Sequence, residues 1–239
     1  MEITKVLPVD CISLIISLTS PRDACRMALL SHAFNSIADS NAVWQMFLPL
    51  DYIHIISNSS SPLSLLSLPK KDLYFTLCYH PILTHNGDMK FQLEKESGKK
   101  WYMVGARALS IQWVDTPRHW TWISLPDSRF CRVAKLKNVG RLEIKGKIGF
   151  RHTPVELDVS IEGTAAGEVR SVILDPPRNM PQQAKERADG WLEIEMGEFF
   201  NGFEDDRTVE FSLREDHDDQ PKRGLIVQGI ELRPKHKHN

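Results

Sequence analysis

One glycine-rich stretch comes close to a phosphate-binding loop without matching it. Five residues separate Gly140 from Gly146, one more than G-x-x-x-x-G-K-[ST] allows, and Ile148 stands where a serine or threonine must reach magnesium. The chain also has no G-x-S-x-G, H-E-x-x-H or G-x-G-x-x-G motif. Carboxylates such as Glu193 and Glu195 usually solvate a strand surface, and sequence spacing does not give the carboxyl separation that glycoside hydrolysis requires. These patterns predict no catalytic residue.

The cysteines show neither zinc-site nor active-site spacing. No C-x-x-C pair and no histidine at zinc-finger spacing accompanies the four of them, Cys11, Cys25, Cys78 and Cys131. Cys78 is close to His80, but a nucleophilic thiol also needs a third, orienting group, so a packed side chain is the favoured interpretation. Reduced thiols that fill apolar space are typical of a cytosolic or nuclear protein. We therefore expect no metal ion and no cofactor.

A cluster of tryptophans has the side-chain type that stacks on sugar rings. Four of the six lie close together, at Trp101, Trp113, Trp120 and Trp122. Trp120 and Trp122 share parity, so in a strand both point to one face, and Trp113 ends a predicted strand just before the turn at 115–117. A flat apolar ring with a polar tip suits a sugar, although core packing is the commoner use of tryptophan. The polar neighbours of Trp113 and Trp120 favour a binding role for these two.

The distribution of charge and glycine divides the chain into two parts. The 239 residues have a net charge of -1, so we expect no nucleic-acid partner, which would need a strongly basic surface. All thirteen glycines lie at Gly87 or later, and residues 1–69 carry only three basic and five acidic side chains. This contrast predicts a helical domain followed by a β domain. We place them at 1–50 and 73–239, with a linker and the start of a short helix at 51–72.

Residues 1–50 predict three short helices. Apolar residues recur at helical spacing in the first two, at Val9, Ile12, Ile15, Ile16, Ala24, Cys25, Ala28 and Leu29. Ser20 and Pro21 are typical of a helix start, and Pro49 ends the third helix. About 40 residues in three helices bury too little surface to be stable alone. The bundle must dock on the second domain or on another protein, and composition alone favours the first.

The rest of the chain predicts a linker, a short helix and a β domain. Residues 57–69 are rich in serine and proline without a regular period, and 70–79 can form a helix with Leu73 and Leu77 inward. Beyond Gly87, apolar and polar residues alternate in the segments 109–113, 155–161, 192–196 and 209–214, and 225–232 is more evenly apolar. The predicted class is α+β, with an antiparallel β-sandwich or jelly roll.

The front part resembles an F-box over residues 5–49. A Leu-Pro start at Leu7, a loop proline at Pro21, a Leu-Ser turn at Leu30 and a terminal Trp44 occur in the expected order. The resemblance implies a set of adaptor-binding residues, namely Leu7, Pro8, Ile12, Ile16, Leu18, Pro21, Leu30 and Trp44. The implied partner is a Skp-family adaptor and, through it, a cullin-RING ubiquitin ligase. His32 stands where most F-boxes have lysine, which would remove one polar contact and leave the apolar interface.

A second resemblance covers most of residues 70–234. Its motifs occur in order at 99–103, 106–113, 115–122, 190–195, 197–200 and 224–234. They look like the phloem protein 2 domain of plants, a jelly-roll-like lectin fold of Nictaba type, so the whole chain resembles the F-box members of that family. The resemblance implies a site for N-acetylglucosamine oligomers or N-glycans at Trp113, Trp120 and Glu215. Residues 149–185 lack an aromatic-rich strand common in the family, and Thr208 stands where an acid can occur.

Together these features predict a non-catalytic substrate receptor of an SCF-type (Skp-cullin-F-box) ubiquitin ligase. Its β domain would capture a target protein, and one mode of capture is binding of the target's glycan. A free lectin with a vestigial front part and a protein-binding sandwich are the alternatives, and a glycosidase is the weakest. No apolar run approaches the roughly 20 residues of a membrane span, and the start at Met1-Glu2 is a poor signal peptide. We expect a protein of the nucleus and cytoplasm with no membrane partner.

Overall fold

The chain folds into two compact units. The computed structural model describes residues 7–137, 155–161, 169–174, 176–177, 180–199, 208–214 and 222–235. The first unit comprises Met1–Ser110, Phe130–Val133 and Gln228–Asn239, and the second comprises Ile111–Arg129 and Ala134–Val227. The predicted helical domain at 1–50 is therefore only part of the first unit, which also includes segments from the predicted β domain.

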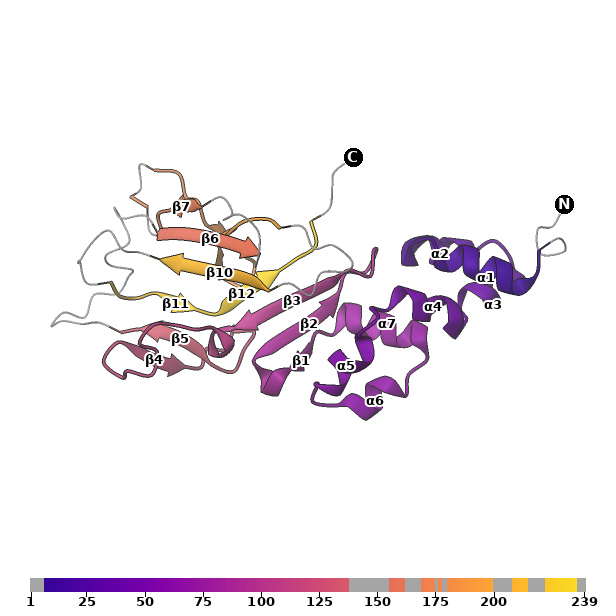
Figure 1. Ribbon diagram of the computed structural model, residues 1–239, viewed down its shortest axis with the longest axis horizontal. Coiled ribbons are helices and arrows are strands. Elements are labelled where there is room, and N and C mark those ends of the chain that lie inside the picture. Colours follow the sequence, from indigo (N-terminus) through magenta and orange to yellow (C-terminus); the bar gives the residue numbers. More distant parts are fainter. Residues whose placement is uncertain are drawn as a thin grey trace. The chain divides into compact units, whose positions relative to one another are not determined.

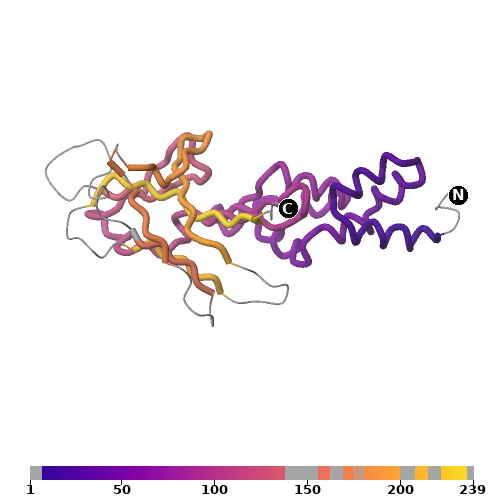
Figure 2. The backbone as a smooth tube through the Cα atoms, turned by 90° about the horizontal axis from the view of Figure 1, so that it is seen from above, coloured from indigo at the N-terminus to yellow at the C-terminus, as the bar shows by residue number. Residues whose placement is uncertain are grey.

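Seven α-helices open the first unit in the part of the chain that the structure describes. They are α1 (Val9–Ser17), α2 (Pro21–Met27), α3 (His32–Ala38), α4 (Asn41–Phe47), α5 (Tyr52–Ser57), α6 (Pro62–Leu66) and α7 (Lys70–Tyr79) (Figure 1). Figure 2 shows the same run of indigo and violet helices from a perpendicular direction. The predicted second helix is divided into α2 and α3, because Ser31 caps a new helix by accepting a hydrogen bond from the Phe34 N–H at 3.3 Å.

The predicted linker at 51–72 is structured. It contains α5 and α6 and the first turn of α7, and α5 buries Tyr52, Ile55 and Ile56. These three positions lie at i, i+3 and i+4, which places them on one face of a helix. The helix is only 6 residues long and the serines of 57–69 follow it directly, so its apolar stripe is too short to stand out from the polar residues around it.

A hydrophobic core joins these helices to the first strands. Trp44 of α4, Tyr74 of α7 and Phe91 in the strand that follows are fully buried in it. The Trp44 and Tyr74 ring centroids lie 5.2 Å apart, and the Trp44 Nε1–H donates to the Ala38 carbonyl at 2.7 Å. The Tyr74 hydroxyl donates to the carbonyls of the next hairpin, at 3.2 Å from the Glu94 oxygen. The small bundle is thus completed by α7 and by a strand of the same chain.

The first unit ends in a four-stranded antiparallel sheet. Its order is β1-β2-β3-β12, formed by β1 (Ile82–Thr84), β2 (Met89–Leu93), β3 (Lys100–Gly105) and β12 (Gly229–Leu232). Phe91 pairs across the strands with Tyr102, and their rings are 5.1 Å apart. The β2–β3 hairpin turns at Gly98, whose φ of +69° favours glycine. A Cβ at this position would lie 2.9 Å from the Phe47 carbonyl oxygen, so the hairpin packs closely against the end of α4.

The second unit contains two three-stranded sheets and a hairpin. One sheet has the order β10 (Val209–Arg214), β6 (Val155–Ile161), β7 (Arg170–Val172), and the other has the order β11 (Ile226–Val227), β5 (Val133–Leu136), β4 (Trp120–Ile123) (Figure 1). The hairpin pairs β8 (Lys185–Glu186) with β9 (Leu192–Glu193). Leu157 and Val172 of the first sheet share a core with Leu136 of the second. Two sheets around a common core form a sandwich, and the predicted α+β class with antiparallel sheets is confirmed.

Three of the predicted strands differ from the structure. Residues 109–113 are not a strand, because a 3-10 helix, η3 (Ala106–Ala108), is followed by a turn in which the Val114 N–H donates to the Ile111 carbonyl at 3.1 Å. The segment 192–196 is reduced to β9. The segment 225–232 divides at Gln228, where the carbonyl accepts the Ala106 N–H at 3.0 Å. Local hydrogen bonds override apolar alternation in the first and third cases.

Candidate functional site

Half of the predicted adaptor-binding residues belong to the core of the helical bundle. Ile12, Ile16, Pro21 and Trp44 are all buried. Ile12 and Ile16 lie one turn apart on the inner face of α1, and the polar atom of Trp44 is satisfied within the chain. These four residues hold the helices together, so their contribution to any docking surface is indirect.

The other half lies at or near the surface of the same helices. Leu18 is 74% exposed at the end of α1, and Leu30 is 69% exposed at the end of the turn between α2 and α3. Pro8 is exposed and Leu7 is half-buried. A single exposed leucine is ordinary on a protein surface, so these residues point to a partner only together with other exposed apolar side chains of the same helices. The structure therefore separates the predicted set into a supporting group and a group that can touch a partner.

Further apolar residues in and next to these helices are exposed. Val9, Leu14 and Ile15 of α1 and Leu29 after α2 are each about half exposed or more. Leu29 follows the end of α2. In α1, Val9 and Ile15 belong to the same run of helically spaced apolar residues as the buried Ile12 and Ile16, so this helix is apolar on more than one face. Periodicity does not distinguish the two faces of such a helix. A helix that is apolar on both faces needs a second surface to pack against.

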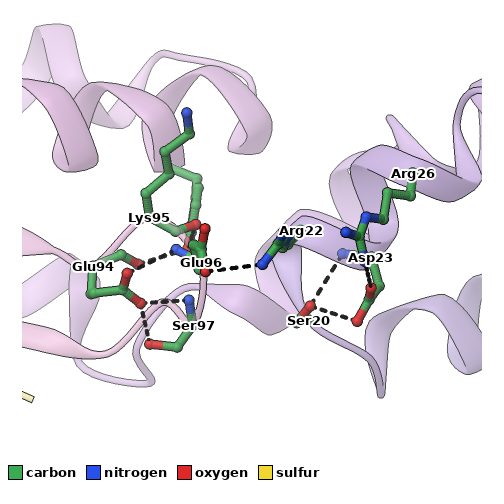
Figure 3. Close-up of polar contacts among 9 residues, drawn as sticks. Ser20, Arg22, Asp23, Arg26, Glu94, Lys95, Glu96 and Ser97 are labelled. Atoms are coloured by element: carbon green, nitrogen blue, oxygen red, sulfur yellow. Dashed lines mark hydrogen bonds and ion pairs between the residues drawn. The ribbon is translucent and has the colours of Figure 1, made fainter. Parts of the chain in front are cut away.

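A helix cap and an ion pair fix the start of α2. The Ser20 hydroxyl accepts the Asp23 N–H at 3.1 Å and donates to the Asp23 carboxylate at 2.7 Å (Figure 3). This hydrogen bond from Ser20 is the main cause that lowers the pKa of Asp23 below its ordinary value, and the cation of Arg26 contributes. Arg22 reaches out from the same helix to Glu96 of the β2–β3 hairpin at 3.3 Å. The exposed Leu30 thus follows a helix that is fixed at its start.

Trp113 is presented by a tightly hydrogen-bonded loop of the second unit. Its side chain is 61% exposed, and its backbone is left-handed with a φ of +59°. The Thr116 N–H donates to the Trp113 carbonyl at 2.9 Å, and the His119 N–H donates to the Thr116 carbonyl at 2.9 Å. The His119 ring packs against the indole with centroids 5.4 Å apart. An exposed indole in a fixed loop is a surface on which a flat apolar face of a ligand can stack.

Trp120 lies at the end of the same loop and at the start of β4. Its Nε1–H donates to the Gln112 carbonyl at 3.1 Å, next to Trp113, and its ring is half-buried. The polar tip of Trp120 is therefore occupied within the chain. Structure and sequence agree that Trp120 and Trp122 occupy one strand, and the structure brings Trp120 and Trp113 into one loop and strand segment.

Comparison with known proteins identifies both halves of the chain. Residues 6–46 match the F-box domain model, and residues 99–149 and 147–234 match the Phloem protein 2 model. A putative F-box protein PP2-B12 of Arabidopsis thaliana is 42% identical over 96% of this chain and 97% of its own length. F-box protein PP2-B10 of the same plant is 40% identical over 95% and 92%, and F-box protein PP2-B15 is 34% identical over 96% of each chain.

The chain belongs to the F-box proteins that carry a phloem protein 2 domain. In this F-box phloem protein, residues 47–98 lie between the two family matches. They form α5, α6, α7, β1 and β2, and they supply much of the core around Trp44. The F-box helices and the segment between the matches are therefore one structural unit, although the two domains are separate in the sequence.

The acidic member of the predicted glycan site, Glu215, lies outside the described residues. Two other acids of the second unit, Asp189 and Glu193, are engaged with Arg187 at 3.2 and 3.4 Å. Arg129 also lies 3.5 Å from Asp189, so these carboxylates stabilise the region around the β8–β9 hairpin. In this F-box phloem protein, Trp113 and Trp120 are the members of the predicted glycan site whose surroundings are known.

The cysteines differ in their surroundings, and the described residues hold no metal-ligand cluster. Burial raises the pKa of the Cys78 thiol to about 11, which disfavours its thiolate. Cys11 and Cys131 are exposed, contrary to the expectation that the cysteines fill apolar space. Among the described residues no three histidine, cysteine or acidic side chains are grouped to hold a metal ion. None of the described helices has the length and hydropathy of a membrane span.

Proposed function

We propose that this F-box phloem protein is a non-catalytic substrate receptor of an SCF-type ubiquitin ligase. Its F-box helices would bind a Skp-family adaptor, and through it a cullin-RING ligase. The observation that carries the proposal is that Leu18 and Leu30 stay exposed although the bundle core is already filled by α7 and β2. Apolar side chains left over after the chain has completed its own core are available to a partner.

The second half of the proposal assigns target capture to the loop that carries Trp113. The exposed indole would stack on a sugar ring of a glycoprotein, and N-acetylglucosamine oligomers are the first ligands to test. The support is the combination of 61% exposure, a left-handed backbone and local hydrogen bonds that hold the ring outward. Binding would not require the loop to order itself, which lowers the entropic cost of association.

Co-purification of the full chain with a Skp-family adaptor tests the ligase half. We expect the double variant Leu18→Asp, Leu30→Asp to lose the adaptor, because two carboxylates would have to be desolvated in the interface. Leu63→Asp is the matched control, since Leu63 on α6 is at least as exposed as Leu18 and Leu30 and lies outside the F-box match. Equal adaptor recovery by the double variant and the control would refute the ligase role and favour a free lectin.

A glycan array of the full chain tests the carbohydrate half. We expect Trp113→Ala to abolish binding, while Trp113→Phe keeps part of it because a smaller aromatic ring still stacks. Trp120→Ala should weaken binding through the loop, since Trp120 holds the Gln112 carbonyl. An intact chain that binds the adaptor and no glycan would contradict the lectin role and favour a protein-binding sandwich. Turnover of chitooligosaccharides would contradict a non-catalytic receptor.

We also propose that the protein acts in the nucleus and cytoplasm. The support is that Cys11, Cys25, Cys78 and Cys131 are all free thiols, as is usual in a reducing compartment. A fluorescent fusion of the full chain is expected to fill both compartments in plant cells. Retention of the fusion in the secretory pathway would contradict the proposal.

A further inference from the structure

His119 is the aromatic neighbour of the exposed Trp113 ring. The two ring centroids lie 5.4 Å apart, and the ring planes are inclined by 34°. His119 is only half-buried and Trp113 is 61% exposed, so this pairing stands at the surface of the second unit. We propose that His119 is a positioning residue that sets the Trp113 ring for stacking on a ligand, an inference that rests on the proposed glycan site.

The backbone of Trp113 needs such support. A left-handed conformation is unfavourable for a residue other than glycine, and Trp113 adopts it with a φ of +59°. Thr116 links the two ring-bearing residues, because its N–H donates to the Trp113 carbonyl and its carbonyl accepts the His119 N–H, both at 2.9 Å. His119 is therefore fixed relative to the Trp113 backbone before any side-chain contact forms.

Lys137 anchors His119 from the neighbouring strand segment. The Lys137 N–H donates to the His119 carbonyl at 2.8 Å, and the Lys137 Nζ donates to the Pro117 carbonyl at 2.7 Å. Lys137 directly follows β5, which belongs to the same sheet as β4. The His119 backbone is thus attached to the sheet as well as to its own loop, which places the imidazole beside the indole.

A neighbouring ring that restricts the indole changes the free-energy cost of stacking a ligand on Trp113. Without it, an indole of this exposure would exchange among rotamers and would have to be ordered when a ligand binds. Ordering one side chain costs about 0.5–1.5 kcal/mol, which corresponds to about a two- to tenfold loss of affinity. His119 contributes by removing this cost, and it does not need to touch the sugar.

Two measurements on the full chain test the role of His119. The first is the affinity for the N-acetylglucosamine trimer. The second is the fluorine NMR resonance of Trp113 without ligand, in protein labelled with fluorotryptophan and assigned by its loss in Trp113→Phe. We expect His119→Ala to broaden this resonance or divide it among rotamers, beyond the shift that loss of the neighbouring ring current causes by itself, and to weaken trimer binding by about two- to tenfold. His119→Phe should restore both, and His80→Ala, at an exposed histidine of the first unit, should change neither.

The outcomes separate this inference from the proposed function. A Trp113 resonance that stays single and equally sharp in His119→Ala would overturn the positioning role, whatever the trimer does. Recovery of the resonance but not of the affinity in His119→Phe would also overturn it, because His119 would then contact the sugar directly. A wild-type chain that fails to bind the trimer would refute the glycan proposal, while the resonance would still report whether His119 positions Trp113.

Discussion

On α1 and at its C-terminal end, apolar side chains of similar size lie either in the core or at the surface. Ile12 and Ile16 are buried, whereas Leu14 and Leu18 are more than half exposed. Burying one such side chain contributes about 1.5–3 kcal/mol, so the inner pair stabilises the bundle and the outer pair has the same free energy available for a partner. Substitutions on the outer face should therefore change binding with little effect on stability.

Trp44 gives a residue-scale prediction for the core. Its Nε1–H donates to the Ala38 carbonyl at 2.7 Å in a fully buried site. Trp44→Phe leaves that carbonyl unpaired and creates a cavity, so we expect the free energy of unfolding to fall by about 2–4 kcal/mol in urea titration. Met46→Ala, on the exposed side of the same helix, should stay within about 0.5 kcal/mol of wild type. Equal losses in the two variants would contradict the assignment of Trp44 to the core.

At the scale of elements, the α2 cap gives a prediction with a pH dependence. Ser20→Ala removes a cap and should cost about 1 kcal/mol in thermal or urea unfolding, whereas Ser36→Ala inside α3 should have a smaller effect. The Ser20 hydroxyl lowers the pKa of Asp23 in the folded state. The stabilisation that depends on this carboxylate is present above the ordinary aspartate pKa and is lost as acid protonates Asp23.

The difference in the free energy of unfolding between wild type and Ser20→Ala should accordingly shrink when unfolding is measured at a pH below the ordinary aspartate pKa. A difference that grows in acid would contradict the assigned hydrogen bond. The side chain of Asp23 is near the surface, so high salt should also reduce the contribution of Arg26 to this site.

Gly98 in the β2–β3 hairpin and Gly190 in the β8–β9 hairpin form a matched pair of glycines. Gly98 and Gly190 both have positive φ, but a Cβ at Gly98 would lie 2.9 Å from the Phe47 carbonyl and a Cβ at Gly190 would meet nothing within 4 Å. Gly98→Ala should therefore lower the free energy of unfolding by clearly more than the roughly 1 kcal/mol expected of Gly190→Ala. Indistinguishable losses would mean that the hairpin does not pack against α4.

Sequence patterns predict an element well where one of its faces is buried and the other is exposed. The alternation at 155–161 and 209–214 corresponds to the paired strands β6 and β10, and the helix at 70–79 has the predicted bounds. Trp113 was placed at the end of a strand, but local hydrogen bonds and a left-handed backbone, which side-chain alternation does not report, make its segment a turn. The tryptophan pair was predictable by residue type, whereas the role of His119 depends on three-dimensional contacts.

At the scale of the whole molecule, chain order and structural units do not coincide. The strand β12 near the C-terminal end pairs with β3, and Trp101 of β3 donates to Glu231 of β12 at 2.8 Å. Strands from the matched phloem protein 2 region thus complete the sheet whose strand β2 contributes Phe91 and Leu93 to the core of the F-box helices. The helical part and this sheet should unfold together.

A fragment of residues 1–50 tests this dependence. It lacks Tyr74, Leu77 and Phe91, which fill the core around Trp44. We expect the fragment to show no cooperative thermal transition by circular dichroism, because its helices bury too little apolar surface alone. A cooperative transition at the temperature of the full chain would show that the F-box helices are independent of the rest of the first unit.

The central claim is that one chain holds the ligase adaptor and a glycosylated target at the same time. The most direct measurement immobilises a Skp-family adaptor, adds the full chain, and follows retention of a carrier protein coupled to N-acetylglucosamine oligomers. We predict that wild type retains the carrier. The double variant Leu18→Asp, Leu30→Asp and the single variant Trp113→Ala should each lose it. Retention that neither variant changes, or adaptor and carrier that displace each other, would contradict the account.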